Sequence, residues 1–209
     1  MSKISLKHSG GNVVSLNSPT SAPTSADVAF KLPNADGTSG QALVTDASGN
    51  LSFSGTGKIL QVVEGTLTSG FTTSSQTMVD VGLSATITPS SASNKILVLL
   101  SLGSFVNRTS HKRAFANILR GSTVLFVGDA ASGEEVTIAR TWRTAQDQYV
   151  MDPLSRSFLD SPNTTSATTY KIQASVASDG GYLHINRPYT QDANGGNTAS
   201  SLILMEVAA

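Results

Sequence analysis

Residues 168–176 read Thr168-Thr-Tyr-Lys-Ile-Gln-Ala-Ser-Val176, and this stretch decides the fold class. Its apolar residues Tyr170, Ile172, Ala174 and Val176 alternate with polar ones. Because successive side chains of an extended strand point to opposite faces, a period of two predicts a β-strand with one buried face.

Short stretches of the same kind follow one another from about residue 58 to residue 209, without a long helical periodicity. Clusters of Gly, Pro, Asn, Asp and Ser separate them, and these residues favour turns. The predicted strands cover residues 59–66, 76–81, 83–88, 95–102, 114–119, 123–127, 136–142, 154–159, 169–176, 182–185 and 202–207. Many short strands with regular turns predict an all-β domain over residues 58–209, a jelly-roll-like β-sandwich that forms the head.

One predicted strand differs from the others because its apolar residues do not alternate. Residues 96–100 read Ile96-Leu-Val-Leu-Leu100, so both faces of this strand are apolar. Such a strand is either central in its sheet or covered by another subunit. We therefore take Ile96, Val98 and Leu100 as candidate subunit contacts.

The first 57 residues have a different texture, with short apolar islands in a background of Ser, Gly, Asn, Thr and Pro. Residues 1–19 predict an attachment arm with a hairpin around Ser9-Gly-Gly11, and residues 20–57 a linker or neck with short strands. Isolated two-stranded hairpins are marginal in water, so we expect this extended arm to dock on a neighbour. The docking candidates are the apolar residues of the hairpin: Ile4, Leu6, Val13, Val14 and Leu16.

Composition excludes several functions. Only 13% of the residues are charged, and 14 basic residues balance 14 acidic ones, so we expect no nucleic-acid binding. Cysteine is absent, which excludes disulfides and thiolate metal sites. The longest apolar run is far below the roughly 20 residues that cross a bilayer, and the N-terminus lacks the apolar run of a signal peptide. We expect a protein made in the cytoplasm that does not insert into membranes.

Residue types that carry chemistry are scattered. His8, His111 and His184 lack metal-ligand spacing, and we expect His184 on the polar side of its strand and neither a metal nor a cofactor. A glycan depolymerase needs two carboxylates about 5–10 Å apart across a groove. The candidates, all in predicted loops where acids usually serve turns, are Glu134, Glu135, Asp147, Asp152 and Asp179. We expect no enzyme and no catalytic residue.

Aromatic and basic residues form one further candidate site, for glycan contact. Tyr and Trp rings stack on the apolar faces of sugars, while polar neighbours bind the hydroxyls. The candidates are Trp142, Arg143, Tyr149, Tyr182, Arg187 and Tyr189. The alternative, which we favour, places the Trp142 ring half-buried at a strand end or in a subunit contact.

An ordered series of motifs resembles a known module. Residues 81–98, Val-Gly-Leu-Ser-Ala-Thr-Ile-Thr-Pro-Ser-Ser-Ala-Ser-Asn-Lys-Ile-Leu-Val, resemble the head module of tail-fibre and other virion structural proteins of marine and cyanobacterial phages. Residues 31–53 look like the neck segment that precedes such heads. The series continues downstream with Leu119-Arg-Gly-Ser-Thr-Val, Gly128-Asp-Ala-Ala, Phe158-Leu-Asp-Ser-Pro, Thr164-Thr-Ser-Ala-Thr-Thr-Tyr-Lys-Ile-Gln, Tyr182-Leu-His-Ile-Asn-Arg and Leu202-Ile-Leu-Met-Glu.

The resemblance implies a virion component, commonly trimeric, without catalytic residues. We therefore expect a homotrimer, either a short fibre or a capsid decoration or cement protein, anchored to other virion proteins by its arm. A host-receptor module that binds surface glycan is the main alternative, and a glycan depolymerase is the third.

Overall fold

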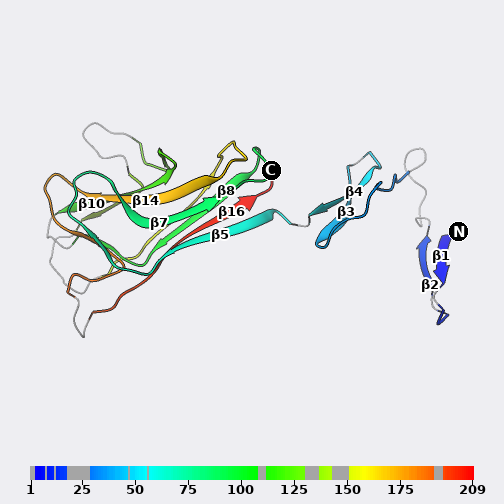
Figure 1. Ribbon diagram of the computed structural model, residues 1–209, viewed down its shortest axis with the longest axis horizontal. Helices are drawn as coiled ribbons and strands as arrows, with labels where there is room; N and C mark the ends of the chain where they lie inside the picture. The colour runs from blue at the N-terminus through cyan, green and yellow to red at the C-terminus, as the bar shows by residue number, and fades with distance from the viewer. Residues whose placement is uncertain are drawn as a thin grey trace. The chain divides into compact units, whose positions relative to one another are not determined.

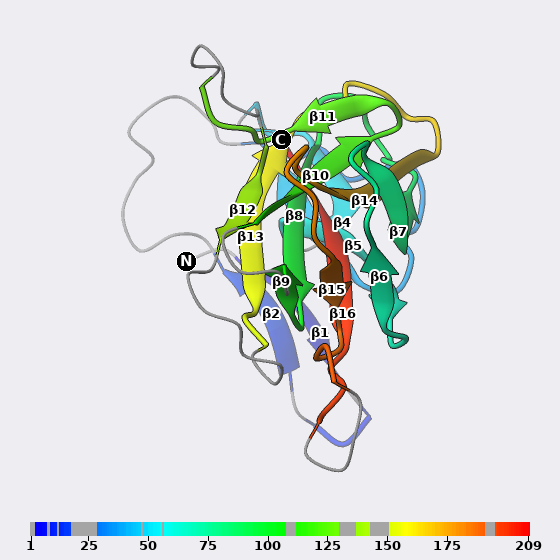
Figure 2. The same ribbon diagram turned by 90° about the vertical axis from the view of Figure 1, so that its left-hand side faces the viewer.

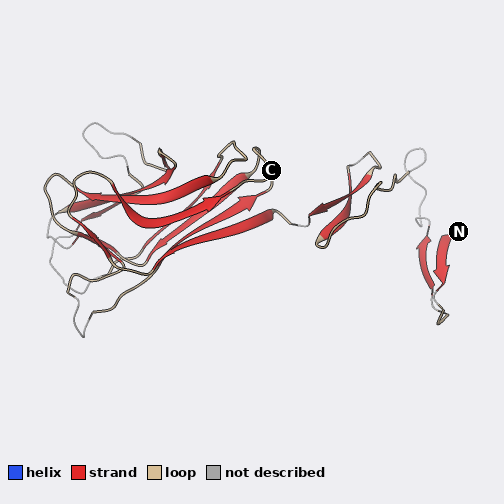
Figure 3. Cartoon of the chain, viewed as in Figure 1, coloured by secondary structure: helices blue, strands red, loops and turns tan. Residues whose placement is uncertain are grey.

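The computed structural model is all-β. It describes residues 3–7, 9–11, 13–17, 29–46, 48–55, 57–107, 112–129, 137–142, 151–190 and 195–209. These residues form sixteen strands and, within the described ranges, no helix (Figure 3). The chain divides into two compact units, Met1–Thr56 and Gly57–Ala209, which we call the N-terminal and the C-terminal unit.

The N-terminal unit contains two antiparallel hairpins. The first joins β1 (Lys3–Lys7) to β2 (Val13–Asn17), and its register sets Ile4 opposite Leu16 and Leu6 opposite Val14. The second joins β3 (Gln41–Thr45) to β4 (Leu51–Gly55). The short hairpins predicted for the first 57 residues are therefore confirmed.

The turn between β3 and β4 is built by Asp46. Its carboxylate accepts hydrogen bonds from the backbone N–H of Ser48 at 2.8 Å and from the side-chain amide of Asn50 at 2.6 Å. Gly49 follows with φ of 84°, and a Cβ there would collide with the carbonyl oxygen of Ala29. The turn therefore needs glycine both for its left-handed backbone and for the close approach of a neighbouring segment.

The C-terminal unit is a sandwich of two antiparallel sheets that lie face to face (Figure 1). The four-stranded sheet has the order β13-β8-β16-β5. Its strands are β5 (Ile59–Leu67), β8 (Lys95–Leu102), β13 (Leu154–Asp160) and β16 (Ser200–Val207). The five-stranded sheet has the order β11-β10-β14-β7, and β12 also pairs with β10. Its strands are β7 (Val79–Ile87), β10 (Arg113–Arg120), β11 (Thr123–Leu125), β12 (Ala139–Trp142) and β14 (Thr168–Val176).

A small bridging sheet connects the two large ones. It consists of β6 (Phe71–Thr73), β15 (Leu183–Ile185) and β9 (Phe105–Asn107), which lie side by side (Figure 2). Along the chain each of these strands lies between a strand of one large sheet and a strand of the other. The chain thus changes sheets three times through the bridging sheet, which closes one end of the sandwich.

The core lies between the two sheets. Tyr170, Ile172, Ala174 and Val176 are all at most 1% exposed, which confirms the inward face predicted for β14. Opposite them, the four-stranded sheet contributes a second set of buried side chains: Ile96, Val98, Leu100, Leu102, Leu202 and Leu204.

The prediction that Ile96, Val98 and Leu100 contact another subunit is wrong. β8 is a central strand between β13 and β16, and these three side chains face the opposite sheet, where they are buried within one chain. The other face of the strand carries Leu97 and Leu99, which are half-buried. The run was apolar on both faces, and the sequence alone did not distinguish inward from outward residues.

β7 was predicted as two strands interrupted near Gly82, but it is one continuous strand. Gly82 has φ of 88°, and the register with β14 shifts between Lys171 and Gln173. The glycine therefore forms a β-bulge that bends the strand without ending it.

Candidate functional site

An apolar band crosses the outer face of the four-stranded sheet. In the strand register Leu159 of β13 lies opposite Leu97 of β8, Leu97 opposite Met205 of β16, and Met205 opposite Val62 of β5. The next row on this face adds Leu99 opposite Ile203. The apolar band is thus made of Val62, Leu97, Leu99, Leu159, Ile203 and Met205.

The band is open to solvent at both edges of the sheet. Val62 is 57% exposed and Leu159 is 56% exposed, whereas the four residues between them are half-buried by their own strand neighbours. Ile59 and Leu60, at the start of β5, are 47% and 45% exposed. Contiguous exposed apolar side chains rimmed by polar residues mark interaction sites, so this sheet face is the candidate assembly surface.

The same face is hollowed between β8 and β13. A depression of about 250 Å³ is lined by Leu99, Leu100, Ser155, Arg156 and Ser157. Leu99 of the apolar band thus lies beside a recess in which a side chain of a partner could fit.

The N-terminal unit also exposes large apolar side chains. Phe30 is 63% exposed, Leu32 78%, Leu43 50% and Phe53 40%. A two-stranded hairpin of this size cannot cover them, because it has one sheet layer and no second layer to pack against. The side chains of the predicted docking residues Ile4, Leu6, Val13, Val14 and Leu16 lie outside the described part, and only their strand pairing is seen.

The predicted glycan contacts are placed only in part. Trp142 is the last residue of β12, and its backbone lies opposite Arg113 of β10. Arg143 and Tyr149 lie outside the described residues. Tyr182, 51% exposed, immediately precedes β15.

Arg187 and Tyr189 follow β15 at its other end, so the structure does not gather them around Tyr182. The Arg187 Nε–H donates to the carbonyl of Pro188 at 3.3 Å, and its stem lies against Gly70. The Tyr189 ring meets the His184 ring edge-on, with 5.7 Å between the ring centroids.

His184 was predicted on the polar side of its strand, and this is wrong. It is 4% exposed, because β15 lies between β6 and β9 and all three of its residues are buried. Its Nδ1 lies 3.0 Å from the Thr72 hydroxyl oxygen.

Two buried polar clusters were missed by sequence reasoning. In the first, Asp160 of β13 accepts hydrogen bonds from the Arg120 guanidinium of β10 at 2.6 and 2.7 Å and from the Tyr170 hydroxyl of β14 at 2.6 Å. Burial and the Asp160 carboxylate both raise the pKa of Tyr170, which therefore stays a proton donor. We name this the Asp160 cluster, and it joins the two sheets.

The second cluster surrounds Glu206 of β16, whose side chain is fully buried. One carboxylate oxygen accepts from the Ser90 backbone N–H at 2.7 Å, the Ser90 hydroxyl at 2.8 Å and the Asn94 amide at 2.6 Å. The other accepts from the Gln61 amide at 2.6 Å. Burial raises the pKa of Glu206, but the bonds from Asn94, Gln61 and Ser90 outweigh it and lower the pKa to about 2.

Both clusters hold the fold together, because each bonds side chains from different parts of the C-terminal unit. Among the carboxylates considered for a depolymerase, Asp179 lies 3.6 Å from the Arg113 guanidinium, while Glu134, Glu135 and Asp147 lie outside the described residues. The described part of the chain brings together no group of three or more potential metal ligands. Nor does any helix in that part have the length and hydropathy to cross a membrane.

The C-terminal unit thus belongs to the class of two-layer antiparallel β-sandwiches. No protein-family model matches this sequence, and no curated protein matches it either.

Proposed function

We propose that this chain is a non-enzymatic structural protein of a bacteriophage particle, a homotrimer that joins other virion proteins through its first 57 residues. The apolar band on the four-stranded sheet carries the assembly part of the proposal. A sandwich needs only the inner faces of its sheets to be apolar, whereas here one row of the outer face is apolar across all four strands, from Leu159 to Val62.

The gain from covering this band is appreciable. Fully burying a side chain such as Val or Leu contributes about 1.5–3 kcal/mol, so completing the burial of Val62 and Leu159 contributes roughly 1 kcal/mol each. A second copy of the chain fits the surface, because a closed oligomer buries the same face of every subunit. The low charge of the protein also favours this, since few charges would need pairing in the interface.

We infer a jelly roll as the specific type of sandwich. Numbering the eight strands β5, β7, β8, β10, β12, β13, β14 and β16 from one to eight, one sheet has the order 1-8-3-6 and the other 2-7-4-5. This is the arrangement of a double Greek key, which recurs in viral capsid and lectin domains. Fold alone does not define function, so the topology adds support without deciding the role.

The virion part of the proposal rests on the series of motifs from residue 81 to residue 206, which resembles the phage head module. The N-terminal unit suits attachment, because its exposed Phe30, Leu32 and Leu43 lack a core of their own to enter. Docking on the particle would supply the missing layer.

Incorporation into particles tests the proposal. Phage particles are produced with either the full chain or a chain lacking residues 1–57, and each chain is measured in purified particles by mass spectrometry. We expect the full chain in the particles and the truncated chain, still folded by circular dichroism, to be missing. A truncated chain present at the normal level would contradict attachment through the arm, and particles without the full chain would contradict the virion role.

A further inference from the structure

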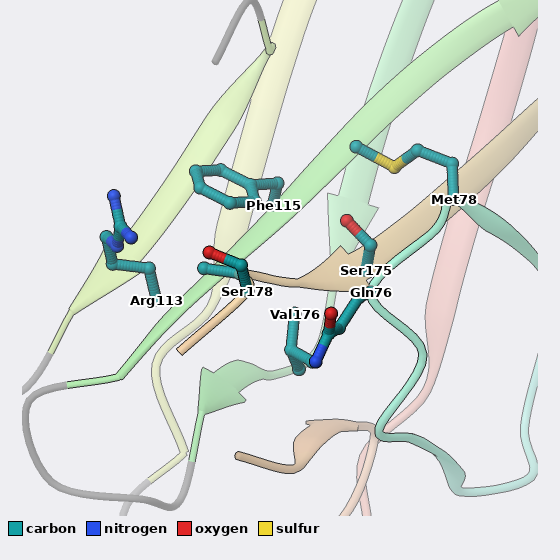
Figure 4. A pocket seen from close by; sticks show the side chains of 8 residues that line it. Gln76, Met78, Arg113, Phe115, Ser175, Val176 and Ser178 are labelled. Atoms are coloured by element: carbon teal, nitrogen blue, oxygen red, sulfur yellow. The ribbon is translucent and has the colours of Figure 1, made fainter. Parts of the chain in front are cut away.

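A small pocket opens in the five-stranded sheet, on the face that points away from the core (Figure 4). Its volume is about 210 Å³. This is room for about seven water molecules at roughly 30 Å³ each, and less than the 300–1,000 Å³ of pockets that take drug-sized ligands. The pocket therefore fits one small ring. Its lining residues are Gln76, Met78, Arg113, Phe115, Ser175, Val176, Ala177 and Ser178.

The pocket combines an apolar wall with polar groups at its rim. Phe115 and Met78 stand on one side, and the Ser175 hydroxyl lies between them and Gln76 (Figure 4). Phe115 and Ser175 are direct cross-strand partners on β10 and β14, so the sheet register fixes this part of the site. Rigid strands position ligand-binding groups more accurately than loops do.

The polar groups of the pocket are not used by the fold. Ser175 is 4% exposed, yet its hydroxyl has no hydrogen-bond partner among the described residues. The side chains of Gln76 and Ser178 are exposed and also make no hydrogen bond within the described residues. The Ser175 oxygen is not among the fully buried polar atoms that lack a partner, so it is open to solvent through the pocket. The hydroxyl can therefore bind a ligand that enters the pocket without giving up a bond within the chain.

Arg113 is the one charged side chain among the described residues that line the pocket. It is held at the rim by Asp179, whose carboxylate lies 3.6 Å from Nε, beyond hydrogen-bond length. The pair is partly exposed, so the guanidinium keeps most of its donors for another acceptor. Guanidinium groups bind carboxylates through two parallel hydrogen bonds.

We propose that this pocket binds a single hydroxylated ring that carries a carboxylate, that is, one unit of an acidic sugar. Arg113 binds the carboxylate, Ser175, Ser178 and Gln76 bind ring hydroxyls, and Phe115 with Met78 contacts the apolar C–H face. Among the described lining residues none was suggested for glycan contact by the sequence, and Arg113 pairs with Trp142 in the sheet. This binding goes beyond the structural role and does not depend on it.

Saturation-transfer NMR and a titration of the intact protein with free glucuronate test the site, with glucose as the neutral match. A single small ring gains few contacts, so we expect a dissociation constant near the millimolar range for glucuronate. We expect at least tenfold weaker binding of glucose. Arg113→Met should weaken glucuronate binding at least tenfold, and Ser175→Ala should weaken it at least threefold. Lys95→Met is the control: it removes an exposed cation of the other sheet and should leave glucuronate binding unchanged.

Folding is checked for each variant by its thermal unfolding midpoint, and Ser175→Ala keeps the proposal testable if Arg113→Met does not fold. Failure of glucuronate to bind the intact protein would overturn the proposal. Equal binding of glucose would overturn the assignment of Arg113 to a carboxylate. Binding that both pocket variants retain would place the ligand elsewhere. None of these outcomes bears on particle incorporation, so the two proposals fail separately.

Discussion

At the scale of single residues, Glu206 is the side chain whose ionisation matters most for stability. It is a fully buried carboxylate that forms no ion pair with the described residues, and four hydrogen bonds take the place of solvent. Ser90 and Asn94 belong to the turn between β7 and β8, where the chain passes from one large sheet to the other. Glu206 therefore links the turn between β7 and β8 to β16 by hydrogen bonds.

The lowered pKa of Glu206 predicts a loss of stability in acid. In the folded protein its pKa is about 2, below the ordinary value of 4.5, so the ionised form is favoured by folding. Its contribution is fully present above pH 4.5 and is lost as the pH falls toward 2. By the shift in pKa the contribution is roughly 3 kcal/mol.

Urea unfolding of the wild type and of Glu206→Gln at several pH values measures this contribution. We expect the variant to be less stable at pH 7, and the difference between the two proteins to shrink steadily between pH 4.5 and 2. A difference that stays constant over this range would show that the Glu206 charge is not stabilised by its neighbours.

At the scale of elements, the Asp160 cluster joins the edge strand β13 to β10 and β14 of the opposite sheet. Tyr170→Phe removes one donor and leaves the carboxylate paired with Arg120. We expect a loss of about 1–2 kcal/mol in unfolding free energy, since the hydrogen bond is made to a charged acceptor. Asp160→Asn should cost more, because it leaves the Arg120 guanidinium, which is partly buried, without its anion.

A double-mutant cycle distinguishes this account from simple loss of packing. If Tyr170 acts through Asp160, then Tyr170→Phe should have a smaller effect in the Asp160→Asn background. Additive effects of the two substitutions would contradict the coupling. Chemical denaturation of the four proteins provides the measurement.

The elements themselves were predictable where periodicity is strong. The alternation of Tyr170, Ile172, Ala174 and Val176 predicted β14 and its buried face, because a period of two indicates a β-strand with one buried face. Which face of β8 packs against the other sheet was not predictable, since a strand that is apolar on both faces can bury either of them in a central position. The bridging strands β6 and β9 were missed because three residues are too few to show a period.

The polar contacts between elements were beyond the sequence for a different reason. Asp160, followed by Ser161 and Pro162, has the pattern of an ordinary turn. Its partners lie on strands of the other sheet, Arg120 40 residues away in sequence and Tyr170 ten residues away. The same applies to Ser175, whose role depends on what the sheet register sets beside it. Long-range pairing places these groups, and local patterns do not encode it.

At the scale of the whole molecule, a single chain leaves apolar surface uncovered on both of its units. The apolar band lies on the C-terminal unit, and exposed Phe30 and Leu32 lie on the N-terminal unit.

Val62→Asp introduces a charge into the band and should dissociate the oligomer, because a buried carboxylate without a partner costs several kcal/mol. Val124→Asp is the matched control: Val124 is 40% exposed on β11, outside the band, and we expect no change in mass.

The central claim is self-association of the intact chain, and light scattering after size exclusion tests it most directly. We predict a mass close to three times the 21.6 kDa of one chain, and a shift toward one chain for Val62→Asp but not for Val124→Asp. A wild-type mass near 21.6 kDa across the concentrations used would contradict the trimer and leave the apolar band without its proposed partner.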